Sequence, residues 1–370
     1  MFQPYRTAEP PISLAALLCR GRPRGPHSVR ALGFAVALTA ASLALACQPT
    51  GQSGARGGSG AAPLPMSGEV PPGLRDGPHD VVINGVRLWY RVGGKAVAGV
   101  PPVVFLHGGP GQGSYHFAAL AGPYLEPSLR LVYCDQRGSG RSERPWTREY
   151  GMPTLVEDLE GVRQALGVAQ IALIGHSFGG ALALDYAAKY PAHVSAVIFV
   201  AGVWDIPLQG RIRCARIRAV YPGAPALDDS ARGADAVEDN CDWFWRLPTA
   251  QRGPIMSVLM FPDSLVRLRL DSVEKASGLR YGGELDAAHF RTAYRFTAYE
   301  QPTMPILLIS GRYDHSGGMS ESLRPLTQLL PNARFLEYEQ SGHFVYLDEP
   351  ERFARDVTAF LNSGRQRGPE

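Results

Sequence analysis

The pentapeptide Gly175-His-Ser-Phe-Gly179 has the Gly-x-Ser-x-Gly form of a nucleophile elbow, a sharp turn between a strand and a helix. It follows the apolar run 171–174 and precedes the helix-forming run 181–190, and this context distinguishes it from an ordinary glycine-rich turn. The flanking glycines are expected because a strained backbone at the nucleophile leaves no room for Cβ atoms on either side. Ser177 is therefore the predicted nucleophile of an acyl-transfer reaction.

A serine hydroxyl is a weak nucleophile at neutral pH, so it needs an imidazole to take its proton and a carboxylate to orient that imidazole. Asp314 ends a loop that follows the apolar run 306–309. His343 follows a second strand-like run, 334–338, through a turn that contains glycine. An Asp after a strand is often only a turn former, but the order Ser177, Asp314, His343 at three strand ends favours a catalytic triad.

Acyl transfer also produces an oxyanion, which backbone N–H groups can stabilise. The segment Leu106-His-Gly-Gly-Pro-Gly111 directly follows an apolar run, and its glycines allow the backbone to approach a substrate closely. We predict that the N–H of Gly108 or Gly109 and the N–H of Phe178 form the oxyanion hole. A tight Gly-Pro turn, the plainer interpretation, would aim the same amides.

Other polar residues near these segments are assigned lesser roles. The side chain of His176 should point away from the nucleophile, because neighbouring residues of a strand alternate, and should serve packing. His315 lacks a Gly-x-His setting. Asp135 follows a strand and is predicted to fix the loop after it and the side chain of Arg137 in that loop, and not to take a proton.

The candidate residues follow apolar runs that alternate with helical stretches. Runs without polar alternation are typical of strands covered on both faces, and βαβ alternation implies a mainly parallel sheet with right-handed crossovers. Asn84-Gly85 separates two alternating segments and predicts an antiparallel hairpin at one sheet edge. The predicted strands are 81–83, 87–92, 103–106, 131–134, 171–174, 194–200, 306–309 and 334–338, and the clearest helices are 154–166, 179–189 and 349–361.

This alternation stops over residues 204–300, which contain clustered aromatics and Arg-rich stretches but no convincing strand. Such an insertion predicts a helical cap after the sixth strand, over the sheet edge where open α/β sheets bind ligands; a separate structural subdomain is the alternative. The Trp/Phe cluster 243–245 is expected in the core of the cap; a platform for the substrate is the alternative. The core of the fold would then comprise residues 74–203 and 301–362, followed by a tail, 363–370.

Of 370 residues, 45% are hydrophobic and 19% charged, which is ordinary for a globular protein. The net charge of +3 is misleading, because five Arg and one Glu give residues 1–46 a local +4 and leave −1 for the rest. No Lys/Arg stripe stands out later in the chain, so nucleic acid is not expected as a partner. The sequence does not indicate an oligomeric state.

The N-terminal segment has the order of an export signal. After its basic residues, the uncharged apolar run 31–46 has signal-peptide length and is short for a bilayer span. It ends in Leu43-Ala-Leu-Ala-Cys47, which resembles a lipoprotein processing site; simple cleavage, giving a free periplasmic or secreted protein, is the alternative. We predict a signal peptide over 1–47, with a membrane tether if Cys47 is lipidated, and a flexible linker over 48–73.

In an oxidising compartment the remaining cysteines need separate interpretations. Cys134 lies in an apolar run and should be a buried small hydrophobe. Cys214 and Cys241 both fall in the predicted cap. The sequence does not decide whether they form a disulfide or remain two free thiols. Neither their spacing nor a histidine cluster indicates a metal site.

From about residue 80 to 362, the chain resembles an α/β-hydrolase of the proline iminopeptidase group of serine peptidases. The specific part of the resemblance is His107-Gly-Gly-Pro-Gly111 followed by Asp135-Gln-Arg-Gly-Ser-Gly-Arg-Ser142. The elbow motif and the order Ser, Asp, His are shared across α/β-hydrolases. The resemblance implies the α/β-hydrolase fold and release of an N-terminal residue, often proline, through an acyl-enzyme without metal or organic cofactor.

The resemblance also implies that carboxylates from the cap hold the free α-amine of the substrate. Phe178 stands where the family usually has Trp, and Arg246 follows Trp245 where a Trp-Glu pair is expected. The unranked candidates for amine binding are Glu238, Asp239, Asp242, Glu274 and Glu284.

The first hypothesis is an exported serine aminopeptidase acting on a short peptide, with Ser177 as nucleophile, His343 as general base and then acid, and Asp314 as its orienting partner. A carboxylesterase or lactonase acting on a small molecule with the same triad is the second hypothesis. The third is a non-catalytic ligand-binding receptor on the same fold, against which the complete triad argues.

Overall fold

The computed structural model describes residues 70–221, 223–224, 241–283 and 294–363. The predicted signal peptide with Cys47, the linker up to residue 69 and the tail from residue 364 lie outside the described residues. Pro72 and Gly73, which the sequence assigns to the linker, form a short 3-10 helix, η1 (Pro72–Leu74), together with Leu74, the first residue of the predicted core, which is buried. No helix in the described ranges has both the length and the apolar character needed to cross a membrane.

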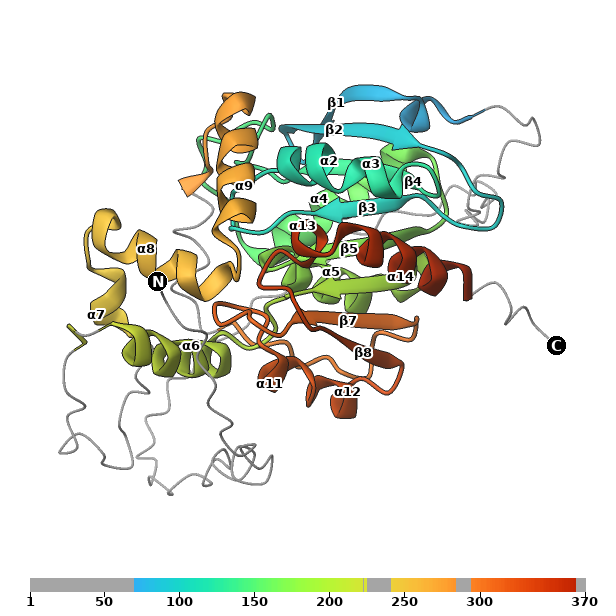
Figure 1. Cartoon of the computed structure of the whole chain (residues 1–370). Helices are drawn as coiled ribbons and strands as arrows, with labels where there is room; N and C mark the ends of the chain where they lie inside the picture. The colour runs from blue at the N-terminus through green and yellow to red at the C-terminus, as the bar shows by residue number, and fades with distance from the viewer. Residues whose placement is uncertain (1–69, 222, 225–240, 284–293, 364–370) are drawn as a thin grey trace, which may run out of the picture. The chain divides into compact units, whose positions relative to one another are not determined.

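A central eight-stranded sheet has the strand order β1-β2-β4-β3-β5-β6-β7-β8 (Figure 1). The hairpin predicted at Asn84-Gly85 joins β1 to β2, which also pairs antiparallel with β4, while all other neighbours are parallel. The prediction of a mainly parallel sheet with an antiparallel edge is confirmed. The strands are β1 (Gly77–Ile83), β2 (Val86–Gly94), β3 (Val103–Leu106), β4 (Arg130–Asp135), β5 (Ile171–His176), β6 (Val194–Val200), β7 (Ile306–Gly311) and β8 (Ala333–Tyr338).

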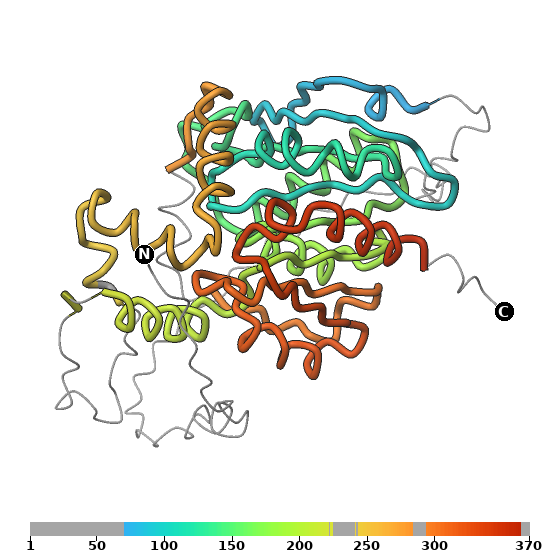
Figure 2. The backbone as a smooth tube through the Cα atoms, in the orientation of Figure 1, coloured from blue at the N-terminus to red at the C-terminus, as the bar shows by residue number. Residues whose placement is uncertain are grey.

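Helices cover both faces of this sheet, as expected for strands without polar alternation. Side chains of β3 alternate between two buried apolar clusters: Val104 joins the cluster under α4 and α5, and Phe105 joins the cluster under α2, α3 and α14. In Figure 2 the C-terminal α14 lies beside α3 although the two are far apart in sequence. The helices are α2 (Tyr115–Leu120), α3 (Gly122–Leu125), α4 (Met152–Leu166), α5 (Phe178–Lys189), η2 (Pro191–His193), α11 (Ser320–Leu323), α12 (Leu326–Leu329), α13 (Val345–Asp348) and α14 (Pro350–Ser363).

Between β6 and β7 the described chain is helical, which agrees with the predicted insertion after the sixth strand. Its elements are α6 (Ile206–Val220), α7 (Asp242–Trp245), α8 (Thr249–Met260) and α9 (Ser264–Ser277), which gather at one end of the sheet (Figure 1). Asp205 and Asp263 cap α6 and α9 by accepting hydrogen bonds from backbone N–H groups of the first turn. Within the described ranges, the β-structure of the insertion is one isolated bridge, Asp205 to Arg295.

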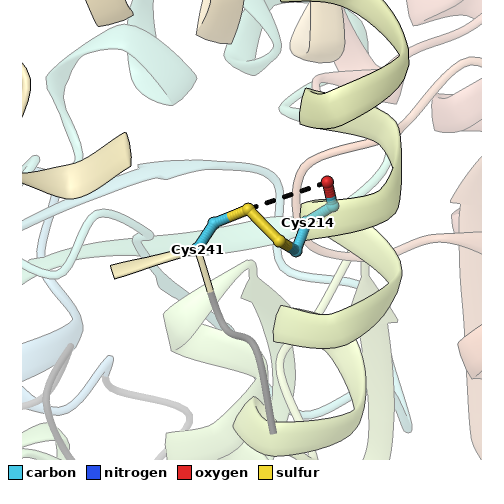
Figure 3. Close-up of a disulfide and its surroundings, with 2 residues drawn as sticks. All are labelled: Cys214 and Cys241. Carbon is cyan, nitrogen blue, oxygen red and sulfur yellow. Dashed lines mark hydrogen bonds between the residues drawn. A yellow bond between two sulfur atoms is a disulfide. The ribbon is translucent and has the colours of Figure 1, made fainter. Parts of the chain in front are cut away.

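Cys214 on α6 and Cys241 at the start of α7 form a disulfide (Figure 3). Of the two interpretations left open by the sequence, the disulfide is the correct one. Both cysteines belong to a small buried cluster with Ile217, Phe244 and Leu259. The disulfide therefore joins α6 to α7 within a hydrophobic core that is separate from the two clusters against the sheet.

Cys134 remains a free thiol and is buried, as predicted. Burial raises the pKa of this thiol, so it stays protonated at neutral pH.

The turn after β8 is held from two sides. The N–H of His343 donates to the carbonyl oxygen of Met260 on α8 (2.8 Å), and the N–H of Gly342 donates to Oδ2 of Asp348 (2.8 Å). The other oxygen of Asp348, Oδ1, is buried without a hydrogen-bond partner among the described residues. Burial raises the pKa of Asp348 to about 6, against the opposing effect of the Gly342 hydrogen bond.

Reduction of the Cys214–Cys241 disulfide should lower the thermal stability of the protein. The bridge joins residues separated by 27 positions, and the lost entropy of an unfolded loop of that size corresponds to about 3.5 kcal/mol. Calorimetry with and without reductant, on protein purified without reductant, measures the effect. The double variant Cys214→Ser/Cys241→Ser is the control and should not respond to reductant. Titration of free thiols at both positions in the parent protein would contradict the assignment.

Asp348→Asn should stabilise the protein at pH 8 more than at pH 4. Because folding raises the pKa of this carboxyl from 3.8 to about 6, its favourable contribution is complete below pH 3.8 and is lost as the pH rises through 6. Asparagine keeps an acceptor for the N–H of Gly342 and carries no charge. Thermal melts of parent and variant at the two pH values make the comparison. An equal gain at both pH values would show that the ionised carboxylate carries no cost.

Candidate active site

Ser177 lies on a strained turn between β5 and α5, with φ 53° and ψ −119°. A Cβ atom built on Gly175 would lie 2.4 Å from the carbonyl oxygen of Gly179, and one built on Gly179 would lie 2.1 Å from that of Leu106. Side chains do not tolerate such contacts, so both positions require glycine. The steric reason inferred from the motif is therefore confirmed.

Asp314 and His343 are adjacent and buried. Oδ2 of Asp314 lies 2.8 Å from Nδ1 of His343 and also accepts from the N–H of Gly318 (2.9 Å), while Oδ1 accepts from the N–H and hydroxyl of Ser316. Burial opposes ionisation of the carboxyl, but the electrostatic interaction with the His343 ring and these hydrogen bonds outweigh it and lower the pKa of Asp314. The carboxylate thus orients the ring through Nδ1, which leaves Nε2 for other contacts.

Ser177 and His343 line the same pocket, which encloses about 700 Å³ including its open mouth. Among the described residues, no hydrogen bond joins the Ser177 hydroxyl to the imidazole. Contacts between a serine and its base are often long without substrate and tighten when substrate binds. The structure therefore brings the three predicted triad residues to one site, with the carboxylate–imidazole pair already formed.

The segment predicted to supply the oxyanion hole lies against Ser177. Strand pairing sets Leu106 beside Gly175, and a Cβ built on Gly108 would lie 2.9 Å from Cβ of Ser177. Gly109 and Phe178 line the pocket, whereas Gly108 is not part of its wall. The N–H of Ser177 is not available to substrate, because it donates to the carbonyl oxygen of Val200.

Asp135 secures this region, but not through the partner expected from the sequence. Its Oδ1 accepts from the N–H and hydroxyl of Ser114 (2.7 Å each), and its Oδ2 accepts from the N–H of Arg141 (2.9 Å). Arg137 instead forms a two-pronged ion pair with Asp158 on α4. The prediction that Asp135 fixes its loop is right and the pairing with Arg137 is wrong, because the planar guanidinium finds a buried carboxylate on the neighbouring helix.

A chain of buried polar side chains lies behind His343. Nε2 of His176 is 3.0 Å from the carbonyl oxygen of His343, and the hydroxyl of Tyr346 is 3.3 Å from Nδ1 of His176 and 2.9 Å from Nε2 of His116. A carbonyl can only accept, so His176 donates through Nε2, accepts from Tyr346 through Nδ1, and Tyr346 accepts from His116. Burial lowers the pKa of His176, and that of His116 to about 3, so both rings are neutral at pH 7.

This chain holds the backbone of the residue that carries the imidazole. His176 serves packing and hydrogen bonding, in agreement with its predicted role. Tyr346 and His116 were not singled out from the sequence, because a contact between residues 230 positions apart has no local signal.

The insertion supplies the outer wall of the pocket. Trp245 lines it, although the cluster 243–245 was expected in the core of the cap; only Phe244 is fully buried there. Neighbouring residues on a helix are about 100° apart, so one of them faces the core while the next turns towards the pocket. The wall residues from the insertion are Ile206, Gln209, Arg213, Trp245, Met256 and Met260.

Of the five carboxylates proposed for amine binding, Glu274 on α9 is the one whose side chain the structure describes. It accepts a hydrogen bond from Nε2 of Gln112 (2.6 Å), burial raises its pKa, and it is not part of the pocket wall. Glu238, Asp239, Glu284 and the side chain of Asp242 lie outside the described residues. In the described ranges, no group of three or more His, Cys, Asp or Glu could hold a metal ion.

Comparison with known proteins agrees with this geometry. Residues 101–350, which include Ser177, Asp314 and His343, match the family described as alpha/beta hydrolase fold. The chain is 26% identical over 287 residues to a proline iminopeptidase of Heyndrickxia coagulans, covering 72% of this chain and 92% of that protein.

Two further similarities show the breadth of the family. A 2-hydroxymuconate semialdehyde hydrolase of Pseudomonas sp. strain CF600 is 28% identical, with 76% of this chain and 93% of that protein covered. The crystal structure of a proline iminopeptidase-related protein from Thermus thermophilus superposes with a TM-score of 0.64 at 25% identity, over 78% of this chain and 98% of that one. The chain therefore belongs to the α/β-hydrolase family and is similar to its proline iminopeptidase group.

Proposed function

We propose that this protein is a serine hydrolase that works through an acyl-enzyme on Ser177. The observation that carries the proposal is the convergence of Ser177, on a strained turn, and the hydrogen-bonded pair His343–Asp314 at one pocket. Nε2 of His343 takes the proton of the Ser177 hydroxyl as its oxygen attacks the substrate carbonyl carbon. The imidazolium then donates that proton to the leaving group, and the acyl group remains on the serine.

Deacylation repeats these steps with water. His343 removes a proton from the water molecule, the water oxygen attacks the acyl carbon, and the imidazolium returns the proton to Ser177. The N–H groups of Gly109 and Phe178 are proposed to stabilise the oxyanion in both halves of the reaction. Each such donor contributes about 3 kcal/mol to catalysis in serine hydrolases.

The first candidate bond is the amide at the N-terminus of a peptide. It is supported by the similarity to proteins named proline iminopeptidases and by the segment His107–Gly111 beside the nucleophile. In this reaction the acyl group on Ser177 would be the N-terminal residue.

The second candidate bond is an ester or lactone, and the pocket wall favours it. No carboxylate lines the pocket among the described residues, and Arg213 is a positively charged member of the wall. A free α-amine therefore has no counter-charge in this part of the site, whereas a neutral or anionic substrate needs none.

We also propose that the protein is exported, as a lipoprotein or in free form. The apolar run 31–46 after a basic segment supports export. The Cys214–Cys241 disulfide adds independent support, because such bonds persist in oxidising compartments.

Ser177→Ala should abolish turnover and labelling by a fluorophosphonate while leaving the melting temperature almost unchanged, because the hydroxyl serves chemistry more than packing. Ser195→Ala, on β6, is the matched control and should retain both activities. Label incorporation by mass spectrometry and thermal melts give the readouts. Residual turnover within tenfold of the parent would show that the nucleophile is misassigned.

The two candidate bonds are separated by a panel of proline and alanine p-nitroanilides and p-nitrophenyl esters. An aminopeptidase should release p-nitroaniline from at least one unblocked aminoacyl anilide, and N-acetylation of that substrate should reduce the rate. Ester turnover without any arylamide turnover would reject the aminopeptidase and leave the esterase. Both activities should disappear in Ser177→Ala.

A further inference from the structure

Arg213 on α6 has a defined position in the pocket wall. Its Nη1 donates to the carbonyl oxygen of Ser316 (3.0 Å), and its guanidinium lies 5.1 Å from the ring centre of Trp245. The same pocket is lined by Ser177 and His343. These two contacts hold the cation beside the reacting groups.

The charge of Arg213 has no carboxylate partner at ion-pair distance within the described part of the chain. The nearby carboxylate of Asp314 is hydrogen-bonded to His343. Burial lowers the pKa of Arg213 to about 10, against the opposing charge of Asp314, so the guanidinium is still charged at neutral pH. Arg216, one turn along the same helix, differs in that it is paired with Glu321 (3.0 Å).

Two other polar side chains of the wall, those of Gln209 and Ser316, already make hydrogen bonds within the protein. The amide of Gln209 uses its oxygen and its nitrogen in hydrogen bonds to main-chain groups of the surrounding loops. The hydroxyl of Ser316 donates to Asp314. A guanidinium has five N–H donors, and the hydrogen bond to Ser316 uses one of them. Outside the triad, Arg213 is thus the described wall residue best able to bind a polar group of the substrate.

We propose that Arg213 binds a carboxylate of the substrate, so that the enzyme prefers acyl compounds that carry a free carboxylate. A planar guanidinium matches the two oxygens of a carboxylate, and apolar neighbours such as Ile206, Met256 and Met260 strengthen that attraction by excluding water. The carboxylate could belong to the acyl part of an ester or to the leaving part, as in the C-terminus of a dipeptide. The inference rests on the proposed hydrolase function, since it uses the same pocket.

The first test measures binding without turnover. In Ser177→Ala, calorimetry should show that 4-phenylbutyrate binds at least tenfold more tightly than its neutral amide, 4-phenylbutyramide. Adding Arg213→Gln should remove this preference, and adding Arg216→Gln, the matched control, should not. Arg213→Lys keeps the charge but not the planar fork, so part of the preference should remain if the fold is intact. Equal binding of acid and amide to Ser177→Ala would overturn the proposal.

The second test locates the carboxylate by kinetics. On the acyl side, p-nitrophenyl hydrogen adipate is compared with p-nitrophenyl hexanoate; on the leaving side, alanyl-4-aminobenzoate is compared with alanyl-4-nitroanilide. Arg213→Gln should raise KM for the carboxylated member of one pair at least tenfold, with kcat changed less than threefold and the neutral member unaffected. The pair that responds identifies the part of the substrate that Arg213 binds.

If neither pair responds although both are hydrolysed, the proposal is wrong. Absence of all turnover in the parent would instead count against the hydrolase function, and the calorimetric comparison would still decide whether Arg213 binds carboxylates.

Discussion

A buried carboxylate hydrogen-bonded to an imidazole, Asp314 with His343, is the interaction on which the rest of the site depends. Removing the charge of a carboxylate from water is costly unless donors replace the lost solvent. Here the loop after β7 wraps the carboxylate with donors from Ser316 and Gly318, and the imidazole supplies another. The orientation of the ring thus follows from the conformation of a loop that contains two consecutive glycines, 317 and 318.

The backbone of His343 is also held in place by hydrogen bonds at both of its polar groups. Its N–H is bound by Met260 of the insertion, and its carbonyl oxygen is bound by His176 at the end of β5. The sheet and the insertion therefore meet at His343. A displacement of α8 would move the imidazole of His343, so the helices that form the pocket wall also contribute to the geometry of the proposed catalytic site.

The sheet and the insertion supply different parts of the site. Parallel strands end at the same edge of the sheet, which brings Ser177, Asp314 and His343 together from β5, β7 and the turn after β8. The insertion adds apolar side chains and Arg213, and its disulfide joins two of its helices. In the proposed function, residues at the ends of the strands would carry out the bond cleavage, and residues of the insertion would select the substrate.

Much of the site follows from the sequence by itself. The elbow, the loop with Gly108 and Gly109, the order of the triad and the strands before them were all predicted, because local patterns of glycine and apolar residues report backbone strain and burial directly. The side-chain partners were decided by the tertiary structure alone. Arg137 pairs with Asp158, Trp245 turns towards the pocket while Phe244 faces the core, and Tyr346 bridges His176 and His116. Some of these contacts join residues that are distant in sequence, and others depend on which side of a helix faces the core. The local spacing of residues does not tell which surfaces of the helices and strands will pack together.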